Sequence, residues 1–324
     1  MGVKKTIKKR EQTEYGIEEV FEIFRREKLA YGIAIPTVQN YYISIQRLTS
    51  SLQVHNPKVQ DFDKSDILEF INILQSDGIR TASINHYLRD IRAFFNWCYR
   101  EGYLNTKIEI KLVKEQEAIK ETYTEEELKK LLTPPATNNY CAWRSWAIVN
   151  WILATGNREK TICNIRIGDL NLQEQEILLR QTKNKKPQII PMSSELSFIL
   201  KKFIKDFRSE AEPEDYLFCN VAGEKLTENA LKLSMIDYNH SREVNRTSVH
   251  ALRHTFAKYW IRNNGDAFRL QKMLGHSSLE MTRRYVNMFS ADLKEGFDDF
   301  SPLDKMMSKT GLKHKIRRKQ QFAY

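Results

Sequence analysis

The residue types and spacing best suited to chemistry lie between positions 248 and 285 of the chain. The segment SVHALRHTF, residues 248–256, contains His250, Arg253 and His254. On a helix, histidines four residues apart share a face, and Arg253 lies on the adjoining one. The planar guanidinium of arginine matches a phosphodiester, and histidine can bind the same anion or move a proton. We therefore expect His250 and Arg253 to meet at one anion.

A pair of histidines at this spacing can also hold a metal ion. A metalloprotease helix of the HExxH type has glutamate directly after its first histidine. Here that position is Ala251. The sequence therefore favours the anion over the metal.

Three further residues extend the pattern. In Leu274-Gly275-His276 a glycine suited to ending a helix precedes a histidine, and Tyr285 follows nine residues later. Upstream, Ala154-Thr-Gly-Asn-Arg158 places an arginine just after a strongly apolar segment. Each of these residues alone is consistent with packing or a solvated surface. Their order and clustering indicate a common site.

Together these motifs resemble the phage-integrase-type tyrosine recombinases, which cut and rejoin DNA at specific sites. The matching text is H-A-L-R-H at 250–254, L-G-H at 274–276, T-R-R-Y at 282–285, T-G-N-R at 155–158 and T-K-N-K-K at 182–186. The match spans residues 121–300. The segment 12–107 resembles the family's core-binding domain only in size, helicity and position.

The resemblance implies how the phosphate is held. Arg158 and Arg253 would bind the non-bridging oxygens of the scissile phosphate. His250 and His276 would help to bind it and would move protons.

It also implies how the bond is broken. Tyr285 would attack the phosphorus and form a 3′-phosphotyrosine. Lys183 would give a proton to the departing 5′ oxygen, with Lys185 and Lys186 as alternatives in the same turn. His254 would be a structural histidine.

This chemistry needs no cofactor in principle. A free tyrosine has a pKa of ~10, so its hydroxyl needs help to lose a proton at neutral pH. Arginines and histidines offset the charge that builds on the phosphorus, and losing one such donor typically costs ~10²–10³-fold in rate. The phosphotyrosine conserves the bond energy, and the arginines replace a divalent cation. We expect neither ATP nor a metal ion to be required.

One departure from the family pattern concerns the surroundings of Arg158. The family usually has an acidic residue three positions later, where this chain has Thr161. Glu159 instead follows the arginine directly, and Asn157 stands where an apolar residue is common. The residues that support Arg158 should therefore differ from the usual set.

The elements that position these residues are mostly helical. Val38, Tyr41, Tyr42, Ile45 and Leu48 recur at three- and four-residue steps, which predicts amphipathic helices in a bundle of about four over 12–107. Thr124 and Glu127 form a capping box at a helix start, and Cys141–Ala154 is apolar on all sides, as in a buried helix. Two short strands, 176–181 and 187–191, enclose a basic turn at 182–186. The predicted fold class is mainly α with a small β-hairpin.

Length and charge set the organisation and the partner. The 324 residues predict two domains. A formal net charge of +11 favours a polyanionic partner, DNA or an anionic membrane surface. The expected parts are a basic arm (1–11), a helical core-binding domain (12–107), a linker (108–120), a catalytic domain (121–300) and a basic tail (301–324).

The cellular setting is predicted to be cytoplasmic and nucleoid-associated. The N-terminus MGVKKTIKKR lacks the apolar region of a secretory signal, and no apolar stretch approaches the ~20 residues of a membrane helix. Four scattered cysteines, without a C-x-x-C pair, indicate neither a zinc site nor a disulfide framework. They are Cys98, Cys141, Cys163 and Cys219.

The expected partner is double-stranded DNA carrying a specific recombination site, bound by a homotetramer, with no membrane. An apolar stripe beyond Tyr285 is predicted to dock on a neighbouring protomer, or else to cap its own domain; it consists of Phe289, Leu293, Phe297, Phe300 and Leu303. The alternatives are a DNA-binding relative without catalysis and a type IB topoisomerase. A relaxase would need a His-x-His metal site, and no two histidines have that spacing.

Overall fold

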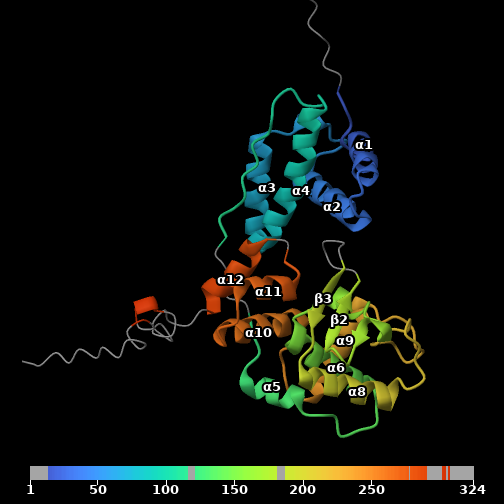
Figure 1. Cartoon of the computed structure of the whole chain (residues 1–324). Helices are drawn as coiled ribbons and strands as arrows, with labels where there is room; N and C mark the ends of the chain where they lie inside the picture. The colour runs from blue at the N-terminus through green and yellow to red at the C-terminus, as the bar shows by residue number, and fades with distance from the viewer. Residues whose placement is uncertain are drawn as a thin grey trace, which may run out of the picture. The chain divides into compact units, whose positions relative to one another are not determined.

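The protein divides into two compact units, Met1–Ala118 and Ile119–Tyr324 (Figure 1). The computed structural model describes residues 14–115, 121–180, 187–276, 278–289, 301–303 and 306. The predicted arm, the 182–186 turn with Lys183, and the stripe residues Leu293, Phe297 and Phe300 lie outside these ranges.

In the first unit, residues 14–115 form an all-helical bundle, as predicted. Its core is rich in aromatic rings: Phe24 packs edge-on against Phe94 and Trp97 at centroid distances of 5.4 and 5.2 Å. Asp63 caps one helix by accepting from the backbone amides of Ser65 and Asp66. The elements are α1 (Ile17–Ala30), α2 (Ile35–Ser51), a 3₁₀ turn (Val59–Asp61), α3 (Lys64–Ser76) and α4 (Thr81–Arg100).

Part of the segment interpreted as a linker packs onto this bundle. Ile108 and Ile110 are buried in its core. The Asn85 side chain donates to the Val113 carbonyl and accepts from the Val113 amide, at 3.0 and 2.8 Å. These contacts attach the chain to the helical unit at least as far as Val113.

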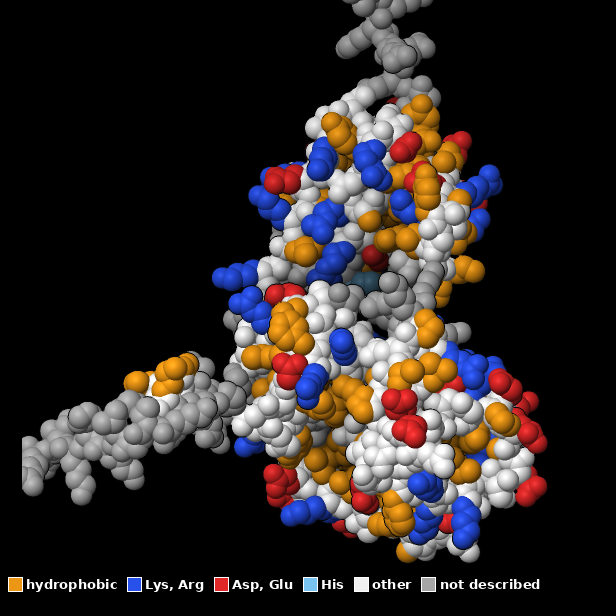
Figure 2. All heavy atoms as spheres, viewed as in Figure 1, with side chains coloured by type: hydrophobic (Ala, Val, Ile, Leu, Met, Phe, Trp, Pro, Cys, Tyr) orange, Lys and Arg blue, Asp and Glu red, His pale blue; other side chains and the backbone are white. Residues whose placement is uncertain are grey.

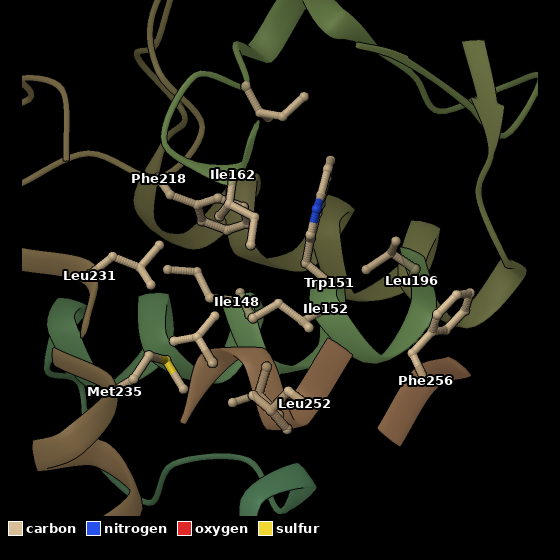
Figure 3. Packing of buried hydrophobic residues seen from close by; sticks show 14 of the residues in the cluster. Ile148, Trp151, Ile152, Ile162, Leu196, Phe218, Leu231, Met235, Leu252 and Phe256 are labelled. Atoms are coloured by element: carbon tan, nitrogen blue, oxygen red, sulfur yellow. The ribbon is translucent and has the colours of Figure 1, made fainter. Parts of the chain in front are cut away.

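The second unit surrounds a buried helix. This helix, α6 (Tyr140–Thr155), is buried on nearly all sides, and residues from α8, α9 and α10 pack around it (Figure 3). Thr124 and Glu127 form the predicted capping box at the start of α5. The other helices are α5 (Glu125–Leu132), α7 (Glu159–Ile162), a 3₁₀ turn (Ile167–Asp169), α8 (Ser194–Phe207), α9 (Glu228–Ser241), α10 (Val249–Arg262), α11 (Ala267–Leu274) and α12 (Leu279–Phe289).

A three-stranded antiparallel sheet in the order β1-β2-β3 completes this unit. Its strands are β1 (Leu170–Asn171), β2 (Glu176–Leu179) and β3 (Gln188–Pro191). The register pairs Ile177 with Ile190, and both side chains are buried. The hairpin was predicted from sequence, whereas the two-residue β1 was not. The mainly α fold class with a small β element is confirmed.

Lysine and arginine side chains are prominent on the visible face of the helical unit (Figure 2). Among the arginines of this unit, Arg80, Arg89 and Arg100 are exposed, and Arg47 and Arg92 are half-buried. Within the described part of the chain, no helix is long and apolar enough to cross a membrane.

Candidate active site

The first arginine of the site lies where α6 ends. Gly156 stops that helix in the left-handed region, with φ +64°. A Cβ added there would lie 2.4 Å from the Phe256 ring and 2.8 Å from the Leu274 side chain. Only glycine therefore allows the end of α6 to approach α10 and α11 this closely. The chain then leads through Asn157 to Arg158, the residue before α7.

Asn157 has a structural reason for being polar. It is buried, and its side-chain oxygen accepts a hydrogen bond from the indole nitrogen of Trp151 at 3.1 Å. A buried indole N–H needs a partner, which Asn157 supplies.

Two arginines gather at the ends of two helices. Arg253 on α10 donates to the carbonyls of Gly156 and Leu274, at 2.5 and 2.8 Å. Arg158 donates to the carbonyls of Leu274 and Gly275, at 3.0 and 3.2 Å. These carbonyls end α6 and α11, where the helix dipole leaves partial negative charge.

The positive charge of this pair is not neutralised by carboxylates. Within the described residues, neither Arg158 nor Arg253 forms an ion pair with Asp or Glu. Burial and the neighbouring Arg158 lower the pKa of Arg253 to about 10. A cation pair that is largely removed from water and has no carboxylate partner is suited to binding an anion.

His276 is fixed between Arg253 and α12. Its Nε2 lies 3.1 Å from the Arg253 guanidinium, and its Nδ1 lies 2.8 Å from the hydroxyl of buried Thr282. Because a guanidinium only donates, Nε2 accepts and Nδ1 carries the proton. The ring stacks on Tyr285 at a centroid distance of 6.0 Å and an angle of 11°.

Tyr285, on α12, is only 3% exposed and belongs to the core of the second unit. Its hydroxyl lies 2.7 Å from Nδ1 of His254. Burial raises the pKa of Tyr285, and the charge and hydrogen bond of Arg253, together with the charge of Arg158, offset part of that rise. The hydroxyl thus lies next to the arginine pair.

His250 is held by the acidic residue that follows Arg158. Its Nδ1 lies 3.3 Å from Oε1 of buried Glu159, whose Oε2 lies 3.2 Å from the Lys232 ammonium. Burial raises the pKa of Glu159, but the hydrogen bonds from His250 and Lys232 outweigh this and lower it overall. Glu159 thus supplies a carboxylate to the site although Thr161 occupies the usual acidic position.

A small pocket lies over the arginine pair. Arg158, Arg253 and Thr161 line it, together with Leu179 at the end of β2 and Gln188 at the start of β3. Gln188 also donates to the Lys272 carbonyl of α11 at 2.8 Å. The hairpin that carries Lys183 therefore starts and ends beside the arginines, although Lys183 itself lies outside the described residues.

The structure thus brings together Arg158, Arg253, His276 and Tyr285, and it fastens His250 to Glu159. It also reveals contacts that the sequence interpretation missed. His254 was assigned a structural role, yet it contacts the Tyr285 hydroxyl. That contact depends on how α12 packs against α10, which residue spacing does not encode. No group of three or more His, Cys, Asp or Glu in the described chain is arranged as a metal site.

Comparison with known proteins identifies the family of the chain. The model of the phage integrase family matches residues 121–291. A second model, the N-terminal SAM-like domain of phage integrases, matches residues 20–103. The chain is 26% identical over 299 residues to tyrosine recombinase XerD of Oceanobacillus iheyensis, covering 89% of this chain and 99% of the relative.

Solved structures share the fold. A lambda integrase dimer bound to a COC′ core site matches with a TM-score of 0.68 and 17% identity, over 87% of this chain and 80% of that one. A lambda integrase tetramer bound to a Holliday junction matches with a TM-score of 0.64 and 17% identity, over 81% and 78%.

Proposed function

The chain belongs to the phage integrase family of tyrosine recombinases, and from this premise we propose that it cuts and rejoins double-stranded DNA at a specific site through Tyr285. One observation carries the proposal: the Tyr285 hydroxyl lies in the core of the unit beside two arginines that no described carboxylate neutralises. A phosphodiester bound by those arginines would be next to the nucleophile.

Arg158 and Arg253 bind the non-bridging oxygens of the scissile phosphate and offset the charge that builds on the phosphorus. They are already oriented by helix-end carbonyls, so little reorganisation accompanies the reaction. His276, fixed by Arg253 and Thr282, stacks on the Tyr285 ring and orients it. Tyr285 attacks the phosphorus and forms a 3′-phosphotyrosine.

His250 binds the same phosphate from the start of α10. Its side chain is 64% exposed, and its Nδ1 contacts Glu159, so Nε2 is the nitrogen that binds the phosphate in this proposal. This contact favours one orientation of the imidazole ring. Glu159 is a positioning residue in this proposal.

Lys183 protonates the departing 5′ oxygen. Support comes from the resemblance of T-K-N-K-K to the family's hairpin and from Leu179 and Gln188, which flank the turn and line the arginine pocket. Lys185 and Lys186 are the alternatives in the same turn. Since the bond energy is kept in the phosphotyrosine and arginines hold the phosphate, the reaction requires neither ATP nor a divalent metal ion.

The active assembly is a tetramer on DNA. Exchange of two duplexes needs four strand cuts, and each chain contributes one Tyr285. The fold shared with the lambda integrase tetramer on a Holliday junction supports this assembly. Leu303, part of the apolar stripe beyond Tyr285, is 67% exposed and is available to a neighbouring protomer. The reaction serves integration and excision of a mobile element or resolution of chromosome or plasmid dimers.

A suicide substrate with a nick near the cleavage site tests the proposal. We expect the protein to form a covalent DNA adduct in EDTA without nucleotide, visible as a slow band on a denaturing gel. Tyr285→Phe should bind the same DNA and form no adduct, because its ring lacks the attacking oxygen. Tyr259→Phe, a tyrosine on α10, is the matched control. A persistent adduct in Tyr285→Phe, or an absolute requirement for Mg²⁺, would contradict the proposal.

A further inference from the structure

We propose that His254 is the residue that accepts the proton of Tyr285 during DNA cleavage and returns it during rejoining. The inference rests on the proposed function and assigns a catalytic role to a histidine that the family resemblance treats as structural. It is carried by the direct contact of 2.7 Å between His254 Nδ1 and the Tyr285 hydroxyl.

The charge near the Tyr285 oxygen supports this role. The positive charge of Arg253 lowers the pKa of Tyr285 and so favours the phenolate that forms when the proton leaves. Nδ1 of His254, in the tautomer with its proton on Nε2, can accept the phenolic proton across the 2.7 Å contact. This is the geometry required of a general base, which must be within about 2.6–3.2 Å of the proton-bearing atom.

The other two histidines of the site are engaged elsewhere. Nδ1 of His250 faces Glu159. His276 accepts from Arg253 at Nε2 and donates from Nδ1 to Thr282, so its ring stacks on Tyr285 with both nitrogens occupied. Of these three imidazoles, His254 is the one whose nitrogen meets the nucleophilic oxygen.

Tyr285 needs such a base. Its side chain is buried, and burial raises its pKa above the ordinary value, so the phenol is protonated at neutral pH. Attack by a protonated phenol would place positive charge on the bridging oxygen, which transfer of the proton to His254 avoids.

The proposed step is balanced. As the bond between the Tyr285 oxygen and the phosphorus forms, the phenolic proton moves to His254 and yields an imidazolium. The bond to the 5′ oxygen breaks, and that oxygen takes a proton from the general acid, proposed above as Lys183. In rejoining, the 5′ hydroxyl attacks, its proton returns to the general acid, and the departing phenolate recovers its proton from His254.

The test separates proton transfer from positioning. In His254→Asn, the amide oxygen can still accept a hydrogen bond near the Nδ1 position but cannot take up the proton. We expect single-turnover cleavage of the nicked suicide substrate, at saturating protein, to fall by ~10²–10⁴-fold. DNA affinity should be unchanged. His240→Asn, an exposed histidine at the end of α9, is the matched control.

A second variant makes the readout specific to the proton. Tyr285→trifluorotyrosine lowers the pKa of the nucleophile, so it ionises without a base. In a protein with trifluorotyrosine at position 285, His254→Asn should reduce the cleavage rate by only about tenfold or less, because general-base catalysis is then no longer needed.

Several results would overturn the inference. The first is cleavage by His254→Asn at the wild-type rate. The second is faster cleavage, which would mean that His254 restrains the tyrosine. The third is an equal loss of rate with tyrosine and with trifluorotyrosine at position 285, which would mean that His254 has a structural role only. Failure of the unmodified protein to form any adduct would instead reject the proposed function, and this inference with it.

Discussion

The two units of this protein differ in what they bury. The core of the helical unit is apolar and aromatic, and its few buried polar side chains are uncharged except for Asp90, which accepts a hydrogen bond from Ser44. The second unit buries charged groups, among them Arg144, Arg253 and Glu159. Burying a charge costs free energy unless it is well paired. The second unit tolerates that cost at its candidate site, whereas we propose that the first unit binds DNA through its surface.

The difference also separates two uses of arginine. In the helical unit Arg89 is exposed, and an exposed cation contributes to DNA affinity through the phosphate backbone. In the second unit Arg253 is 6% exposed and is held by two helix-end carbonyls. A fixed, desolvated cation stabilises charge that develops during a reaction. The same residue type should therefore govern binding in one unit and rate in the other.

The largest expected effect comes from damage to the apolar core. Phe94 is fully buried and packs against Phe24 and Trp97. Phe94→Ala should destabilise the helical unit by about 3–5 kcal/mol, because it removes buried surface and leaves a cavity. Calorimetry should show the transition of that unit shifted to lower temperature and the second unit unaffected. Tyr99→Ala, on the exposed side of the same helix, is the control. An equal shift of both units would show that they unfold as one.

Removing the buried cation should mainly affect the rate. Arg253→Ala should reduce cleavage at saturating protein by ~10²–10³-fold or more, because a preorganised donor to the phosphate is lost. The carbonyls of Gly156 and Leu274 would also lose a donor, at a cost of about 1–3 kcal/mol in stability. Cleavage kinetics and thermal unfolding measure the two effects. Arg262→Ala, exposed on the same helix, should leave cleavage unchanged. Near-normal cleavage by Arg253→Ala would place the phosphate elsewhere.

The smallest expected effect is at the surface of the helical unit. Arg89→Ala should weaken DNA binding modestly and reduce the slope of log affinity against log salt concentration by about 1, as for one lost phosphate contact. Cleavage at saturating protein should not change. Arg26→Ala, whose guanidinium is already paired with Glu22, should have less effect. A change in cleavage rate without a change in affinity would reverse the contrast between the two units.

Local sequence signals predicted the elements well. The apolar segment Cys141–Ala154, predicted to be a buried helix, lies within α6. The capping box of Thr124 and Glu127 formed as expected. These features depend only on residues a few positions apart in the chain, so a short segment of sequence is enough to predict them. The strand Leu170–Asn171 was missed because two residues carry no periodic pattern, and it exists only by pairing with β2.

The sequence by itself was enough to predict the family, the fold class and four residues that the structure brings together, because residue type and order along the chain are sufficient for a motif. These four residues are Arg158, Arg253, His276 and Tyr285. The sequence did not determine which histidine meets the nucleophile or which carboxylate serves His250. Those contacts join α10 to α12 and α7 to α10, so they depend on how the helices pack around α6. Close packing fixes such distances to a fraction of an ångström, and only the folded chain contains that information.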